Sequence, residues 1–142
     1  MSRKTVFKIS PIQDKELQRK YAEECGAPFC PDLFAYSMIN QENDELMGMS
    51  QFDISGDSGY IRTLKPKNGY SDFEAMFILG RATMNFIDLC GNHTCRAALD
   101  AGDERLLRCI GFKLTDDGEY FADMSHMFDG SCDGKPVDLS KP

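Results

Sequence analysis

Residues 64–91 read LKPKNGYSDFEAMFILGRATMNFIDLCG, and this stretch decides the fold class. An apolar strand end is followed by a polar loop and then by one long apolar segment. Ser71 and Glu74 have the spacing of a capping box, in which two side chains satisfy backbone groups at the start of a helix. Gly91 suits the left-handed residue that ends such a helix. The stretch therefore predicts a strand, a loop and a helix from about Ser71 to Cys90.

The predicted helix is apolar around most of its circumference. Its polar side chains form one narrow stripe, which consists of Glu74, Arg81, Asn85 and Asp88. A helix with this pattern is covered on more than one side. We expect it to pack on a sheet and under a second element, or against a second copy of the chain. The second alternative predicts a homodimer.

Short alternating segments on both sides of this helix predict a mixed sheet. Expected strands are residues 5–9, 34–39, 46–54, 60–64, 93–99, 112–114 and 120–124, and expected helices are 10–25, 71–90 and 103–110. The three strands between residues 34 and 64 are joined by tight turns, so they must be antiparallel. The fold class is therefore α/β, with a mixed, mostly antiparallel central sheet flanked by helices in the order β-α-βββ-α-β-α-ββ.

Two local patterns refine this expectation. Ser10, Pro11 and Gln13 have the spacing of a second capping box with proline at the first helical position. Gly26 suits the end of that helix, and residues 26–31 then form a linker. Gly48 lies inside a strand, where glycine marks a bulge or a close approach of the backbone.

Composition and charge limit the classes of function. The chain has 142 residues, a net charge of -7 and a pI near 4.8. Its length fits one domain, which we place at residues 1–128, with a C-terminal tail at 129–142 that is rich in turn formers. The negative charge disfavours nucleic acid and anionic membrane surfaces as partners. It favours, weakly, a cationic substrate.

The six cysteines and the N-terminus bear on the cellular compartment. Residues 1–8 contain no apolar run of signal-peptide length, and no segment has the length and apolar character of a membrane span, so we expect a cytoplasmic protein. Thiols stay reduced in that compartment, so we expect free and mostly buried cysteines. Cys90, His93 and Cys95 are the alternative, a metal site. No paired C-x2-C ligands are present, and we therefore expect no metal.

Three stretches together resemble the GCN5-related N-acetyltransferase (GNAT) superfamily. Residues 44–52, DELMGMSQF, resemble its third strand, and Leu64-x-Pro66 resembles its central strand before the acetyl-CoA-binding loop. Residues 104–112, ERLLRCIGF, resemble its last helix, which ends in an apolar residue followed by Gly-Phe. The order and spacing of the three carry the likeness, which covers about residues 5–128.

The resemblance implies a site and a reaction. Members of the superfamily hold acetyl-CoA in a wedge between two parallel strands, with its diphosphate on backbone N–H groups at a helix start. An amine then attacks the thioester directly. The acceptor implied here is a small-molecule or peptide amine that the sequence does not identify. The implied acetyl-CoA-binding residues are Leu64, Gly69, Tyr70, Ser71, Asp72, Phe73, Glu74 and Ala75.

The loop departs from the superfamily pattern, so the chain resembles a divergent member with a degenerate acetyl-CoA loop. The usual loop reads Gln/Arg-x-x-Gly-x-Gly/Ala, whereas this chain keeps only Gly69. Asp72 and Glu74 place two carboxylates in the first turn of the helix. Each stabilises the helix start by roughly 0.3–1 kcal/mol and would repel a diphosphate by a comparable amount.

The catalytic residues stay unassigned. The superfamily's usual Tyr and Asn fall on Leu107 and near Asp100, and Leu107 cannot donate a proton. Arg62 could hold a substrate carboxylate, with a surface ion pair as the alternative. Other candidates, each with a structural alternative, are Tyr36, Tyr60 and Tyr120 as acids, His93 and His126 as bases, and Cys109 as a nucleophile or a core residue. Residues 116–119 form a turn and not a calcium loop.

Two functions follow from these observations. The first is an acyl-CoA-dependent N-acetyltransferase that acts on an amine. The second is a degenerate binding or assembly module that has lost acetyl-CoA chemistry, which the loop carboxylates and Leu107 favour.

Overall fold

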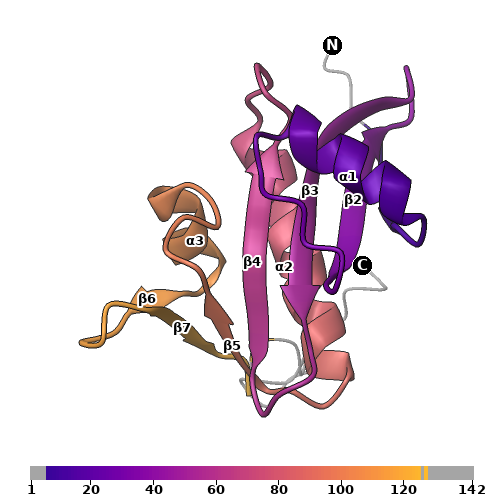
Figure 1. Cartoon of the computed structure of the whole chain (residues 1–142). Helices are drawn as coiled ribbons and strands as arrows, with labels where there is room; N and C mark the ends of the chain where they lie inside the picture. Colours follow the sequence, from indigo (N-terminus) through magenta and orange to yellow (C-terminus); the bar gives the residue numbers. More distant parts are fainter. Residues whose placement is uncertain (1–5, 126, 128–142) are drawn as a thin grey trace, which may run out of the picture.

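The computed structural model describes residues 6–125 and 127. The described residues form a seven-stranded sheet in the order β1-β2-β3-β4-β5-β7-β6, in which only β4 and β5 pair in parallel (Figure 1). This confirms the predicted fold class and element order. The tail predicted at 129–142, His126 and Cys132 lie outside the described residues. The elements are β1 (Phe7–Pro11), α1 (Lys15–Glu24), β2 (Phe34–Asn40), β3 (Glu45–Asp53), β4 (Gly59–Pro66), α2 (Phe73–Leu89), β5 (Thr94–Ala97), α3 (Glu104–Ile110), β6 (Lys113–Leu114) and β7 (Tyr120–Asp123).

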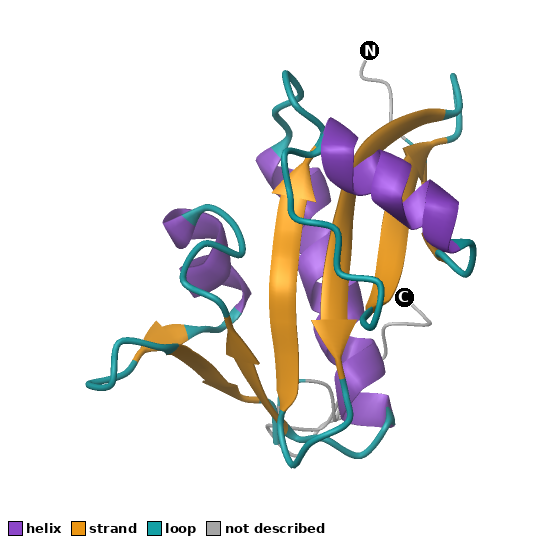
Figure 2. Ribbon diagram, in the orientation of Figure 1, coloured by secondary structure: helices purple, strands orange, loops and turns teal. Residues whose placement is uncertain are grey.

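Helices cover both faces of the sheet (Figure 2). Neighbouring residues of a strand point to opposite faces. Ser50 of β3 bonds to Thr83 of α2, and the next residue, Gln51, bonds to Gln18 of α1. Helix α1 therefore lies on one face and α2 on the other, where α3 packs beside it.

Helix α2 is covered as its apolar pattern predicted, by the sheet and by α3. Gly80 lets the helix approach closely, because a Cβ there would lie 2.9 Å from both Ile110 of α3 and Leu64 of β4. On α2, the large apolar side chains of Ile78 and Leu89 remain exposed. The predicted homodimer stays a prediction. Among the described residues, no helix is both long and apolar enough to cross a bilayer.

The predicted start of α1 is wrong. Ser10 and Pro11 belong to β1, where they pair with Ser37 and Tyr36 of β2. The strand satisfies the backbone of Ser10, and proline is tolerated at the end of an edge strand because it has no N–H to leave unpaired. Asp14 caps the helix instead, since its Oδ1 accepts from the backbone N–H of Glu16 at 2.9 Å.

The predicted capping box of α2 is also wrong. Asp72, and not Ser71, is the N-cap, and its Oδ1 accepts from the backbone N–H of Ala75 at 3.0 Å. Both residue types cap well, but a carboxylate also interacts favourably with the positive end of the helix dipole. Gly91, with φ 103°, follows the other end of the helix as predicted.

Gly48 marks both a bulge and a close approach, as predicted. Strand β3 carries one extra residue, Met47, relative to β2. At Gly48 a Cβ would lie 2.5 Å from Cε of Met76 and 2.8 Å from the carbonyl oxygen of Lys65. Only glycine lets α2 and β4 come this close to β3.

Candidate functional site

Strands β4 and β5 pair for only three residues and then separate. Gly59, Tyr60 and Ile61 pair with Cys95, Arg96 and Ala97, and the N–H of Ala98 still donates to the carbonyl of Ile61 at 3.0 Å. Strand β5 ends at Ala97, whereas β4 continues to Pro66. Beyond Ile61 the two strands are no longer neighbours, which is the wedge that the resemblance implied.

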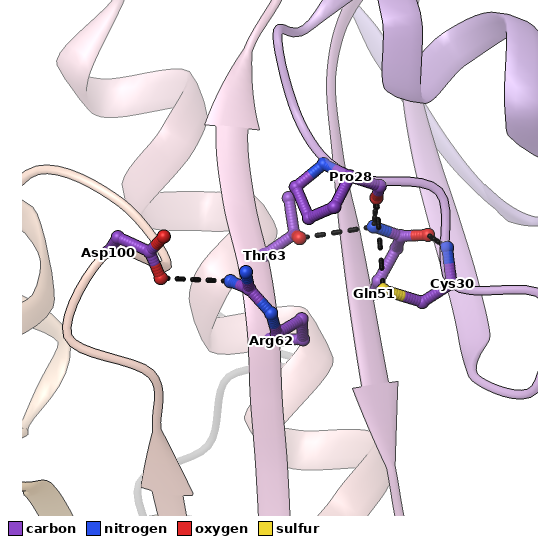
Figure 3. A network of polar contacts seen from close by, with 6 residues as sticks. All are labelled: Pro28, Cys30, Gln51, Arg62, Thr63 and Asp100. Carbon is purple, nitrogen blue, oxygen red and sulfur yellow. Dashed lines mark hydrogen bonds and ion pairs between the residues drawn. The ribbon is translucent and has the colours of Figure 1, made fainter.

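The separation coincides with a bulge in β4. Phe52 of β3 pairs with Ile61 and Gln51 pairs with Thr63, so Arg62 has no partner on β3. Bulges are common beside active sites because they redirect a side chain. Figure 3 shows the Arg62 side chain in front of β4, between Asp100 and the residues around Gln51.

The far end of β4 leads to the start of α2, which borders a cavity of about 310 Å³. The cavity lies between the loop after β4 and the first residues of α3. The guanidinium of Arg105 stacks over the ring of Phe73 at 4.1 Å, which joins the two helix starts. The lining residues are Pro66, Tyr70, Ser71, Asp72, Phe73, Met76, Asp103, Arg105 and Leu106.

Several predicted cofactor residues therefore line one cavity, but the backbone donors there are partly used. Asp72 occupies the N–H of Ala75, and Ala75 itself is fully buried. The N–H groups of Phe73 and Glu74 make no hydrogen bond to another described residue. Two donors thus remain for an anion at this helix start. Ser71 and Glu74 are exposed.

Tyr70 and Gly69 shape the loop. The Tyr70 hydroxyl donates to Oδ2 of Asp72 at 3.4 Å. Burial, and then the charge of Asp72, raise the pKa of Tyr70, so its hydroxyl stays protonated as a donor. Gly69 has φ 83°, and a Cβ there would meet open space, so glycine serves the turn and not a close approach.

The wedge itself is occupied by the chain's own backbone. We call residues 98–103, which follow β5, the 98–103 loop. The N–H of Leu64 donates to the carbonyl of Ala101 at 2.7 Å. Gly102 lies so close to β4 that a Cβ on it would be 2.4 Å from the carbonyl oxygen of Leu64. Leu64, predicted to contact acetyl-CoA, contacts this loop instead.

The other side of the bulge is held by a buried network that sequence reasoning missed (Figure 3). The Gln51 amide donates to the carbonyl of Pro28 at 2.7 Å and to the Thr63 hydroxyl at 3.1 Å. It accepts from the N–H of Cys30 and from the Gln18 amide. Both glutamines are fully buried. For Gln51 a signal was present, because it stands in a mostly apolar strand, whereas Gln18 stands among the charged residues of α1.

Arg62 joins β4 to the 98–103 loop. One of its guanidinium nitrogens donates to Oδ1 of Asp100 at 2.9 Å, with side-chain exposures of 27% for Arg62 and 73% for Asp100. An exposed pair of this kind contributes roughly 0–1 kcal/mol. Arg62 was expected either to hold a substrate carboxylate or to form a surface ion pair. The structure shows the ion pair and places it at the bulge in β4.

The other candidate catalytic residues lie away from the bulge at Arg62 or in the core. Leu107 is fully buried in α3. Tyr36 packs on Phe52 and Phe86 on the α2 face, where burial raises its pKa, and Tyr120 packs on Phe112. Tyr60 lies partly buried on β4. Tyr36 and Tyr60 are thus the half-buried strand residues of the structural alternative, whereas Tyr120 is buried in the core.

His93 and the cysteines also belong elsewhere. His93 contacts Asp88 at 2.6 Å after the end of α2, about 25 Å from its start at 1.5 Å per residue. The expectation that Cys109 lies in the core is wrong, because α3 buries Leu106, Leu107 and Ile110 and turns Cys109 outward. All five described cysteines are free thiols, but only Cys25 and Cys95 are buried, so the expectation that the cysteines are mostly buried is wrong for the described ones. Within the described ranges, no group of three or more His, Cys, Asp or Glu is placed to hold a metal ion.

Comparisons of sequence find no relatives, whereas comparisons of structure do. No protein-family model matches the chain, and no curated protein does. The PaiA N-acetyltransferase of Thermoplasma acidophilum, solved with coenzyme A, matches 82% of this chain and 96% of its own at a TM-score of 0.60 and 14% identity. The ribosomal-protein-S18-alanine N-acetyltransferase of Escherichia coli matches 83% of this chain and 90% of its own, at 0.60 and 15%.

The chain has the GNAT fold. YhhK of Escherichia coli, bound to coenzyme A, extends the likeness, with 83% of this chain and 98% of its own matched at a TM-score of 0.55 and 14% identity. At these identities the likeness establishes the fold, which confirms the resemblance at that level. Asp72 and Glu74, where the sequence departs from the superfamily pattern, lie at the start of α2, and Leu107 is buried in α3.

Proposed function

We propose that the chain is an acyl-CoA-dependent N-acetyltransferase that transfers an acetyl group to an amine. One observation carries the proposal: in a GNAT fold, β4 and β5 separate beside the bulge at Arg62, in line with the start of α2. From Pro66 back to Arg62, β4 spans about 13 Å at 3.3 Å per residue. Acetyl-CoA would lie along this stretch as an extended co-substrate.

Residues of the chain can anchor the anionic end of the co-substrate. The free N–H groups of Phe73 and Glu74, together with the helix dipole, attract a diphosphate. Lys65 and Lys67 lie at the same end of β4 and add positive charge. Asp72 and Glu74 oppose it, so we expect modest affinity.

The reaction needs no proton donor at the position of Leu107. The amine nitrogen forms a bond to the carbonyl carbon, the carbon–sulfur bond breaks, and the amine loses one proton to water. A thiol with an ordinary pKa near 8.5 leaves readily as the thiolate and takes up a proton afterwards. An apolar, buried Leu107 is compatible with this sequence of steps.

The contact between Leu64 and Ala101 favours a second candidate, a binding or assembly module without acetyl-CoA chemistry. Acetyl-CoA can lie beside β4 only if the 98–103 loop leaves the wedge and frees the Leu64 N–H. A module that never binds acetyl-CoA would keep this contact permanently. The two candidates therefore differ in whether the loop moves.

Calorimetry with acetyl-CoA separates the candidates. The wild type is compared with the double variant Asp72→Asn, Glu74→Gln, in which Asn still caps the helix. Two relieved repulsions of about 0.5–1 kcal/mol each predict roughly 5- to 30-fold tighter binding by the variant. Binding that tightens in this way supports the enzyme. No detectable heat at millimolar acetyl-CoA with either protein supports the module.

A further inference from the structure

We infer that Arg62 binds a carboxylate of the acceptor, so that the acceptor is an amine that also carries a carboxylate, such as an amino acid. The inference rests on the proposed function, because it places the acceptor beside the thioester. It also names the site on this chain that selects the acceptor.

Arg62 lies where we expect the thioester of acetyl-CoA. The thioester of a co-substrate laid along β4 from α2 reaches the point where β4 and β5 separate, and Arg62 is the bulged residue at that point. An attacking amine must therefore approach beside Arg62. The bulge turns this side chain to the front of β4, next to the 98–103 loop (Figure 3).

The partner of Arg62 in the structure, Asp100, is a carboxylate. The guanidinium has five N–H donors in a planar fork, and this fork fits a carboxylate with two parallel hydrogen bonds. Among the described residues it makes one hydrogen bond, to Oδ1 of Asp100. Asp100 is itself an exposed carboxylate, so the structure already shows the chemical group to which Arg62 donates. A substrate carboxylate can replace it at little cost, because the pair is exposed.

Binding of acetyl-CoA requires the 98–103 loop to move, and this loop carries Asp100. Asp100 and Ala101 belong to the same loop, and acetyl-CoA must displace Ala101 from Leu64. The same displacement separates Asp100 from Arg62 and leaves the guanidinium without its partner. Binding of acetyl-CoA thus removes the competing carboxylate, and we expect the acceptor to bind more tightly when acetyl-CoA is present.

Lys65 and Lys67 do not compete for this role. Lys65 is three residues along β4 from Arg62, about 10 Å at 3.3 Å per residue, on the side of the diphosphate. Arg62 is therefore the cation placed for the acceptor, whereas the lysines are placed for the co-substrate.

Two measurements test the inference. Thiol release from acetyl-CoA is followed with each standard amino acid and with its amide, which keeps the amine and loses the carboxylate charge. Independently of turnover, the Nε–H signal of Arg62 is followed by NMR during titration with acetate and with acetamide. Variants are Arg62→Met, Arg62→Lys and Asp100→Asn. The control is Arg96→Met, which removes another exposed ion pair, between Arg96 of β5 and Glu119 just before β7.

We expect saturable shifts of Arg62 with acetate and none with acetamide. At least one amino acid should have a KM about tenfold or more below that of its amide. Arg62→Met should abolish that difference, and it should tighten acetyl-CoA binding by at most about fivefold, because the ion pair that holds the loop is worth roughly 0–1 kcal/mol. Arg62→Lys should keep part of the difference, and Asp100→Asn should lower KM for the amino acid. Arg96→Met should change neither quantity.

Two results separate failure of the inference from failure of the proposed function. Amides that react as well as amino acids, or an Arg62 signal that responds to acetate no more than that of Arg96, would overturn the carboxylate site while the acetyltransferase stands. A saturable Arg62 response in a protein that shows no heat with acetyl-CoA would support the carboxylate site and overturn the enzyme.

Discussion

The backbone N–H of Leu64 and the carbonyl of Ala101 are joined by a 2.7 Å hydrogen bond at the place where β4 and β5 are no longer neighbours. A parted pair of strands leaves backbone groups that need partners. Here the 98–103 loop supplies one of them. The 98–103 loop therefore fills the wedge of this GNAT fold, and binding of acetyl-CoA there must include the free energy of opening it.

Replacing Gly102 by Ala should destabilise this closed arrangement. The added Cβ would lie 2.4 Å from the carbonyl oxygen of Leu64, which is backbone and cannot move aside cheaply. We expect a loss of about 1–3 kcal/mol in the free energy of unfolding, measured by urea denaturation. Gly56→Ala is the control, because its nearest neighbour is 3.8 Å away. An equal effect of both changes would contradict the close approach.

Gln51→Met should remove the network that holds the linker of residues 26–31. Methionine has a similar size but leaves the N–H of Cys30 and the carbonyl of Pro28 without their partner. The buried Gln18 amide and Thr63 hydroxyl also lose a partner. Leaving such groups unpaired costs about 1–3 kcal/mol, again measured by urea denaturation. Gln13→Met at an exposed position is the control. Proteolysis within residues 26–31 should also accelerate, and an unchanged rate would argue that the linker is held by other contacts.

The buried thiols predict a loss of stability in alkali. Burial raises the pKa of Cys25 and of Cys95 from 9.0 to about 12. A pKa raised by folding gives a stabilisation that is complete below pH 9 and is lost as the pH rises towards 12. We expect Tm to fall more steeply over that range in the wild type than in Cys25→Ala, Cys95→Ala. Parallel curves would show that other groups govern the alkaline transition.

The same burial predicts selective alkylation. Cys90 and Cys109 are exposed and should react with iodoacetamide at pH 8 in the folded protein, whereas Cys25 and Cys95 should not. Peptide mass spectrometry assigns the modified residues. Modification of Cys95 at a rate similar to that of Cys109 would contradict the buried position.

The exposed apolar side chains of α2 keep the homodimer as a testable proposal. Ile78 and Leu89 are eleven residues apart, so they lie on the same side of the helix about three turns from each other. Light scattering at micromolar concentration should give the mass of a dimer, and Ile78→Asp should lower it to that of a monomer. A monomeric wild type would remove the proposal.

Periodicity and turn residues were sufficient to predict the order of the elements, because each strand and helix has its own local pattern. The starts of α1 and α2 were not predictable in the same way. Ser10 and Ser71 have correct capping-box spacing, but Asp14 and Asp72 compete for the same role, and tertiary pairing of Ser10 with β2 decides the first case.

The candidate site was predictable only in part. The resemblance located the loop from Gly69 to Ala75, which does border a cavity with α3. The occupation of the wedge by Ala101 could not be read from the sequence, because it is a contact between backbones that no side-chain pattern records. The bulge at Arg62 was hidden for the same reason, since a register shift depends on two strands at once.

The network around Gln51 gives the two sides of Arg62 unequal mobility. Residues 28–30 are anchored by three hydrogen bonds to the fully buried side chains of Gln18 and Gln51. Beyond Ala98, residues 99–103 are tied to β4 through one backbone bond and one exposed ion pair. Thermal motion will therefore swing the loop and leave the linker in place. A molecule that reaches Arg62 must therefore enter from the side of the 98–103 loop, which opens, while the linker of residues 26–31 forms a fixed edge of the entrance.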